Sequence, residues 1–298
     1  MQQTRLDTAR IRAARRVIDP IFLDTPLYRC EALEHLGCTV SIKLETANPV
    51  RSFKARGTEV VASRLAYKGS PAVVCGSAGN LGQALAWSGR ARGLEVTVVA
   101  SRFAPAVKLD HIRALGARLE LVDGDNEMAR TRAAAIARHE GIGLLDDSSD
   151  IETCEGAATI GLELAEAVSS FDAVLIALGG GALATGVGHV MKTLAPDVEV
   201  ICVQPAGAPA MTRSWLSGAL SPPSRLTPSQ TLSPAGVQFR RSSTTSSWSV
   251  TTLSWSRKHR SSRVCGYFWR TLASWSNRRP RSASRPSSKT VTASLAAT

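Results

Sequence analysis

The chain has 298 residues, of which 44% are apolar, and its 36 lysines and arginines against 24 aspartates and glutamates give a formal charge of +12. Taken as an average, this composition indicates a globular protein with a basic surface and a nucleic-acid partner. The positions of the charges assign the whole positive excess to the last third of the chain. No acidic residue follows Glu199, and residues 1–199 carry 22 basic and 24 acidic side chains, a net charge of −2.

Two further classes of protein are excluded. Six cysteines without a Cys-x-x-Cys pair do not indicate a disulfide scaffold or a structural zinc site, so we expect no metal centre. The first 16 residues are polar and rich in arginine, and no run reaches the roughly 18 apolar residues that span a bilayer. We therefore expect a cytoplasmic protein without a membrane partner.

Between about residues 20 and 204, short apolar runs alternate with longer segments of helical period, which is typical of an α/β domain with a parallel sheet. The predicted strands are 39–45, 72–76, 95–100, 118–122, 173–178 and 198–203. The predicted helices are 54–67, 80–92, 105–115, 126–139, 154–168 and 184–194. The strands are near-continuous apolar runs, as strands buried on both faces are.

This pattern ends at about Arg213. Residues 214–298 contain 22 serines, five of the six tryptophans and no acidic residue, and they show no sustained apolar period. The composition is typical of a disordered basic segment, although such segments are poor in aromatic residues.

The first of three informative turns is Asn-Pro-Val-Arg-Ser-Phe-Lys-Ala-Arg-Gly at residues 48–57, which places Lys54 at a predicted helix start. A lysine held out of water near the positive end of a helix is suited to Schiff-base chemistry. The alternative is an ordinary solvated lysine.

The other two turns are rich in glycine, and each connects a predicted strand to a helix. Residues 77–83 read Ser-Ala-Gly-Asn-Leu-Gly-Gln, and residues 178–186 read Leu-Gly-Gly-Gly-Ala-Leu-Ala-Thr-Gly. Backbone amides at such helix starts suit a carboxylate or a phosphate. Tight packing of a helix on a strand would also explain either turn taken alone.

In this order and spacing, the three turns resemble those of the pyridoxal-phosphate enzymes of the tryptophan-synthase β-subunit fold type. Arg56-Gly57 after the lysine is most similar to the threonine/serine dehydratase branch. The resemblance covers roughly residues 20–213 and implies an α/β fold of two parallel-sheet, three-layer domains (fold type II). Residues 1–55 and 146–213 would form an incomplete large cofactor-binding domain, with residues 56–145 inserted as a small domain. It also implies a homodimer.

The resemblance assigns roles to individual residues. Lys54 would form the internal aldimine with pyridoxal phosphate and remove the substrate Cα proton, and Phe53 would pack against the cofactor ring. Asn80 would hydrogen-bond the 3′ oxygen of the cofactor. The substrate carboxylate would be held by Ser77, the second catalytic residue, and by the amides of Ala78, Gly79, Asn80 and Leu81. The cofactor phosphate would be held by Gly179, Gly180, Gly181, Ala182 and Leu183.

The reaction implied is elimination of the β-hydroxyl from a small amino acid, L-threonine or L-serine, to give a 2-oxo acid and ammonia. Serine racemases and diaminopropionate ammonia-lyases share the lysine and both loops, so racemisation and elimination from other β-substituted amino acids stay open. Glu155 and Glu163 lie on one predicted helix, and we interpret them as a solvated face rather than a catalytic pair.

For residues 214–298 we hypothesise an out-of-frame tail. A shift of one base turns TCN serine codons into codons for Phe, Leu, Ile or Val, and the tryptophan codon into one for Leu, Met or Val. A misread apolar core would therefore contain many serines and tryptophans. The alternatives are a basic tail that binds nucleic acid through residues such as 256–263, a new folded domain, or an inactive relic. We expect no nucleic-acid partner.

Overall fold

The computed structural model describes residues 6–36, 38–204, 209–217 and 290–295. They form two compact units, each with its own sheet. Unit 1 contains residues 25–45 and the described chain from 160 onward, and unit 2 contains residues 6–24 and 46–159. These compact units divide the chain after Glu45 and Thr159. We expected domain limits after residues 55 and 145, and those limits stay predictions.

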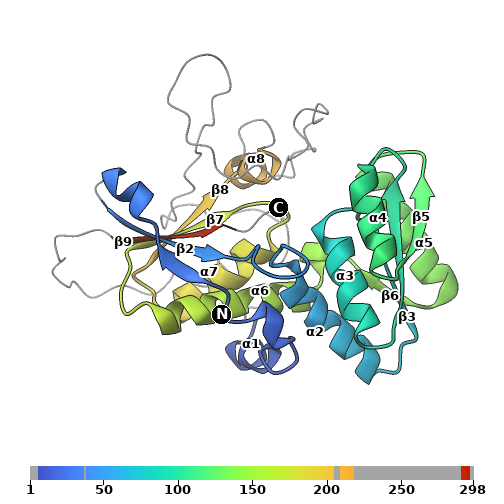
Figure 1. Cartoon of the computed structure of the whole chain (residues 1–298), viewed down its shortest axis with the longest axis horizontal. Coiled ribbons are helices and arrows are strands. Elements are labelled where there is room, and N and C mark those ends of the chain that lie inside the picture. The colour runs from blue at the N-terminus through green and yellow to red at the C-terminus, as the bar shows by residue number, and fades with distance from the viewer. Residues whose placement is uncertain (1–5, 37, 205–208, 218–289, 296–298) are drawn as a thin grey trace, which may run out of the picture. The chain divides into compact units, whose positions relative to one another are not determined.

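Unit 1 is built on a five-stranded sheet in the order β1-β2-β9-β7-β8. β1 (Leu27–Arg29) is antiparallel to β2 (Thr39–Leu44), and η2 (Glu31–Leu36) connects them. The other neighbours are parallel: β2 with β9 (Thr290–Leu295), β9 with β7 (Ala173–Ala177), and β7 with β8 (Glu199–Val203). Figure 1 shows α6 (Ile151–Ala167) and α7 (Ala182–Leu194) on one side of this sheet and α8 (Ala210–Ser217) on the other.

The helix α7 lies at the centre of the packing in unit 1. All its residues from Ala182 to Met191 are buried, as expected for a helix that is apolar on every side. It approaches α6 closely at Gly161, where an added Cβ would lie 2.9 Å from the Cβ of Val190. The helix that follows the third glycine turn is therefore held by close packing on α6 along Val187 and Val190.

Unit 2 has a four-stranded parallel sheet in the order β5-β4-β3-β6, covered on both faces. Its strands are β3 (Ala72–Cys75), β4 (Glu95–Ser101), β5 (Arg118–Val122) and β6 (Gly143–Leu145). Its helices are α1 (Thr8–Ala14), α2 (Lys54–Tyr67), α3 (Asn80–Arg90), α4 (Ala106–Ala114) and α5 (Asn126–Glu140), with short turns η1 (Pro20–Phe22) and η3 (Asp147–Ser149). Val73 packs with α2, α3 and α4, whereas its neighbour Val74 packs with α5 on the opposite face.

The predicted fold class is confirmed, since both sheets are largely parallel and alternate with helices along the chain. Each predicted strand and helix is present, with ends that differ by a few residues. The sequence reasoning missed α1, α8, β1, β6 and β9.

The prediction of an irregular segment from residue 214 is wrong in two places. The helix α8 continues to Ser217, and residues 290–295 form β9 between β2 and β7. Thr290, Val291 and Thr292 are β-branched residues, which favour strands, and the neighbouring strands offer hydrogen bonds on both sides. The rest of the predicted tail lies outside the described residues.

Candidate active site

The lysine turn is held in place by its own polar side chains. Asn48 Oδ1 accepts hydrogen bonds from the amides of Val50, at 3.2 Å, and Ser52, at 3.3 Å. Ser52 Oγ in turn accepts one from the Lys54 amide at 3.2 Å. Arg51 has a φ of 53°, in the left-handed region that residues other than glycine rarely adopt. The turn therefore fixes where α2 begins, and Lys54 is its first residue.

The amine of Lys54, at the start of α2, forms an ion pair with Asp147. Its Nζ lies 2.6 and 2.8 Å from the two carboxylate oxygens of Asp147, and 4.8 Å from the ring centroid of Phe53. The Lys54 side chain is 14% exposed, that of Asp147 is 18% exposed, and Phe53 is buried. The alternative of an ordinary solvated lysine does not fit this geometry.

Asp147 reaches Lys54 because α2 crosses the first part of α6, up to Thr159, at very short range within unit 2. A Cβ on Gly57 of α2 would lie 2.8 Å from Thr153 Cα, and a Cβ on Gly156 of α6 would lie 2.5 Å from Gly57 Cα. Beside this crossing the fully buried Arg56 donates a hydrogen bond from Nη1 to Thr159 Oγ1 at 2.9 Å. Only glycines allow this approach, which brings the segment before α6 next to the start of α2.

The second turn also lies in unit 2, between β3 and α3, and α3 packs against α2. Ser77 Oγ accepts a hydrogen bond from the Gly79 amide at 3.2 Å. Gly79 is the N-cap of α3 and supplies no side-chain cap, so this helix start is suited to binding an anion. Gly82 permits the tight turn, since a Cβ there would lie 2.0 Å from the Ser77 carbonyl oxygen.

The third turn lies in unit 1, between β7 and α7. Gly179 and Gly180 are exposed, whereas Gly181, the N-cap of α7, is buried and has a φ of 103°. Behind the turn, Gln204 Nε2 donates to the Leu178 carbonyl at 3.2 Å, and Gln204 Oε1 accepts from the Thr212 amide at 3.0 Å. Gln204 thus connects the end of β7 to α8 and supports the loop.

The chemistry of these groups fits pyridoxal phosphate. The loop before α7 has no side chains at three successive positions, and its helix start carries no side-chain cap, as a site for a phosphate requires. The amine of Lys54 is largely withdrawn from water. Burial raises the pKa of the Cys75 and Cys154 thiols to about 12, so neither competes as a nucleophile near neutral pH.

Comparison with known proteins decides the family. The profile of the family described as "Pyridoxal-phosphate dependent enzyme" matches residues 18–249. The chain belongs to this family. The match extends beyond residue 213, where the sequence resemblance that we recognised ends. The pyridoxal-phosphate cofactor and the fold type II architecture expected from the sequence are thereby confirmed.

Three members of the family illustrate the similarity. The chain is 32% identical over 200 residues to threonine dehydratase 2 of Solanum lycopersicum, which covers 66% of this chain and 34% of that protein. It is 31% identical over 210 residues to L-threonine ammonia-lyase of Thermotoga maritima, covering 70% of this chain and 52% of that protein. The structure of serine racemase from Dictyostelium discoideum matches with a TM-score of 0.65 and 30% identity, covering 70% of this chain and 69% of the racemase chain. The chain therefore spans only about a third to a half of the two curated relatives.

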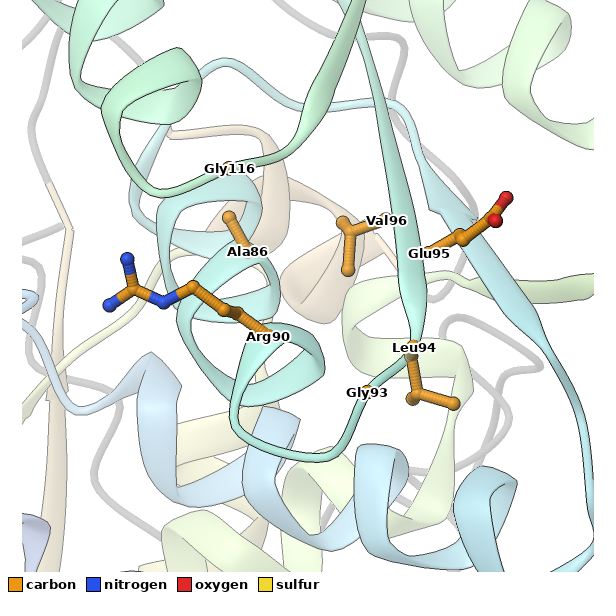
Figure 2. A pocket seen from close by; sticks show the side chains of 7 residues that line it. All are labelled: Ala86, Arg90, Gly93, Leu94, Glu95, Val96 and Gly116. Atoms are coloured by element: carbon orange, nitrogen blue, oxygen red, sulfur yellow. The ribbon is translucent and has the colours of Figure 1, made fainter.

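A pocket of about 270 Å³ in unit 2 lies at the opposite end of α3 from the second turn. Its lining includes Arg90 at the end of α3, about 15 Å along the helix from Asn80 at its start. Figure 2 shows that the side chains of Arg90 and Glu95 point away from each other, so they do not converge on one ligand.

The described residues contain neither a cluster of metal-ligating side chains nor a helix long and apolar enough to cross a membrane.

The interpretation of Glu155 and Glu163 as a solvated face is wrong, because both are buried. Glu155 pairs with Arg10 at 2.5 Å, and Glu163 pairs with Lys43 at 2.6 Å. Burial raises the pKa of the Glu155 carboxyl, and the hydrogen bond from Arg10 opposes that rise. Their partners come from distant segments, so the helical spacing alone gave no sign of the pairing.

Two residues of the candidate site were missed by the sequence reasoning. Asp147 is 93 positions from Lys54, and Gln204 follows β8 directly. Both come after the carboxyl end of a parallel strand, which is where α/β folds place ligand-binding groups. That position was the available signal for both residues.

Proposed function

We propose that this protein is a pyridoxal-phosphate dependent ammonia-lyase that converts L-threonine or L-serine to a 2-oxo acid and ammonia. The observation that supports the proposal most directly is the largely buried amine of Lys54 at the start of α2, in a chain that belongs to this enzyme family. The curated relatives named threonine dehydratase and L-threonine ammonia-lyase favour this substrate class.

In this proposal each turn has a separate task. Pyridoxal phosphate, when bound, supplies the electron sink that weakens the substrate Cα–H bond. Lys54 anchors the cofactor and accepts the Cα proton at Nζ, and Phe53 packs beside the ring. Asn80 orients the ring by a hydrogen bond. Ser77 and the amides from Ala78 to Leu81, at the start of α3, bind the substrate carboxylate, and the amides from Gly179 to Leu183 bind the phosphate.

The experiment is to incubate the full chain with pyridoxal phosphate, reduce with borohydride, and locate the modified lysine by mass spectrometry. We expect the adduct on Lys54, and none after Lys54→Ala. Lys68→Ala is a matched control, because Lys68 caps the other end of the same helix and is exposed. Formation of 2-oxo acid from L-threonine and L-serine is then measured. An adduct that persists in Lys54→Ala would refute the assignment.

Racemisation is a second candidate, which the likeness to the serine racemase of Dictyostelium discoideum favours. The two reactions are separated by analysing the serine that remains after incubation. D-serine would indicate racemisation, and keto acid without D-serine would indicate elimination. A homodimer, and a cytoplasmic location in keeping with the free cysteines among the described residues, belong to the same proposal.

We also propose that the recorded segment beyond about residue 214 is read in a neighbouring frame. The curated relatives named above match 66% and 70% of the chain, which supports a change near residue 214, whereas the family profile matches as far as residue 249, which counts against a shift before that residue. A shifted chain could be active or inactive. Deamination of L-threonine and L-serine is therefore measured for both the recorded chain and a frame-restored chain. The nucleotide sequence around codons 210–220 is the test, and stop codons in the other frame would contradict the proposal.

A further inference from the structure

The contact between Lys54 and Asp147 assigns a role to a residue outside the three turns. Both carboxylate oxygens of Asp147 lie within hydrogen-bond distance of the Lys54 amine, at 2.6 and 2.8 Å. Both side chains are less than one fifth exposed, so water screens the pair less than it screens a surface pair. Schiff-base chemistry at Lys54 does not by itself require a carboxylate, so the close contact of Asp147 with Nζ needs a separate explanation.

The backbone around Asp147 is tied on both sides. Thr153 Oγ1 donates hydrogen bonds to the carbonyl of Asp147 and, at 2.7 Å, to that of Asp150. The Asp146 amide donates to Asp150 Oδ2 at 2.9 Å, which closes the short turn η3. These hydrogen bonds hold the backbone that carries the Asp147 carboxylate in one conformation.

The same threonine connects Asp147 to the helix that carries the lysine. Thr153 Cα lies 2.8 Å from the place where Gly57 would carry a Cβ. Gly57 is three residues after Lys54 on α2. One residue thus holds the Asp147 backbone and packs against the first turn of α2, so the distance between the carboxylate and the lysine amine is fixed by packing.

We propose that Asp147 is a positioning residue that holds the Lys54 amine, as an ammonium, whenever that amine is not bonded to the cofactor. The inference rests on the proposed role of Lys54. In such an enzyme the lysine is released each time a substrate amine takes its place, and a free four-carbon side chain would otherwise sample many rotamers. Asp147 limits it to one position and lowers its reactivity until the ion pair opens.

The test measures the reactivity of Lys54 in the cofactor-free full chain with an amine-acylating reagent, read by mass spectrometry. Asp147→Asn keeps the shape of the side chain but removes the charge, and we expect Lys54 labelling to rise about tenfold, as for the loss of a charge-assisted hydrogen bond. Labelling of Lys43, which is buried in the folded chain, reports any general unfolding in the same sample. Asp147→Glu, which restores the charge, should return labelling towards that of the unchanged chain.

Asp146→Asn is the matched control, because Asp146 is the neighbouring carboxylate and bonds to Ser149 at 2.8 Å. It should leave Lys54 labelling unchanged. Added salt should raise Lys54 labelling only slightly in the unchanged chain, because the pair is largely buried, and should have no effect in Asp147→Asn. The rate at which pyridoxal phosphate attaches to the protein, followed by absorption, should rise in Asp147→Asn in parallel with labelling.

Equal labelling of Lys54 in the unchanged chain and Asp147→Asn would overturn the inference. Failure of the proposed function has a different signature, since pyridoxal phosphate would then form no reducible adduct on Lys54 in any variant. The labelling ratio does not depend on that adduct, so the two failures are distinguishable.

Discussion

The helix crossing at Gly57 and Gly156 yields a prediction in which two effects have opposite signs. Alanine is favoured over glycine in a helix interior by about 1 kcal/mol, so Gly156→Ala would stabilise the protein if nothing opposed it. The added Cβ, however, would lie 2.3 Å from the Arg56 carbonyl oxygen and 2.5 Å from Gly57 Cα. These are backbone atoms of α2, which cannot rotate away as a side chain can. Overpacking of this kind costs about 1–3 kcal/mol, and the upper end applies here.

We therefore expect Gly156→Ala to lower the free energy of unfolding by about 2 kcal/mol. Urea unfolding, monitored by circular dichroism, measures the free energy. In a separate thermal melt the melting temperature should fall by roughly 4–8 °C. Ala134→Gly, inside α5, measures the helix-propensity effect alone and should cost about 1 kcal/mol. A Gly156→Ala variant more stable than the unchanged chain would refute the close crossing, and with it the account of how Asp147 reaches Lys54.

Three further predictions concern other parts of the two units. Arg51→Gly should raise the melting temperature by a few degrees, because a left-handed φ of 53° costs a residue other than glycine about 1 kcal/mol. Burial raises the pKa of Cys75 and Cys154 from 9.0 to about 12. The unfolded chain therefore loses these protons first, so the free energy of unfolding should fall as the pH rises from 9 towards 12. The fall should be smaller in Cys75→Ala. Gln204→Leu removes the two hydrogen bonds behind the glycine loop. It should weaken binding of pyridoxal phosphate about tenfold in an equilibrium titration.

The regular elements of both units were predictable because their sequences are consistent at short range. The strands β4 and β7 are buried on both faces, and their apolar runs extend over almost the whole strand. The helix α2 was predicted with its observed ends, Lys54 and Tyr67. The three-residue strands β1 and β6 are too short to show a period, and β9 pairs with strands far away in sequence.

The charged residues show the limit of reasoning from local pattern more clearly. Lys43 and Glu163 are both buried, and Lys43 Nζ also donates to the Thr25 carbonyl at 2.6 Å. A buried charge needs a partner to offset the loss of water, and that partner belongs to another element. Spacing along one helix cannot reveal it. The same reason explains why Asp147 was not expected beside Lys54.

The glycines of the three turns serve two different purposes. At Gly57 and Gly82 a Cβ would collide with the backbone, so close packing explains why both positions are glycine. Gly181 differs, because it needs a φ of 103° and no backbone atom lies among the close contacts of its Cβ position. Its neighbours Gly179 and Gly180 are exposed. Packing does not account for side chains missing from an exposed loop at a helix start, whereas an anion that must approach the backbone does.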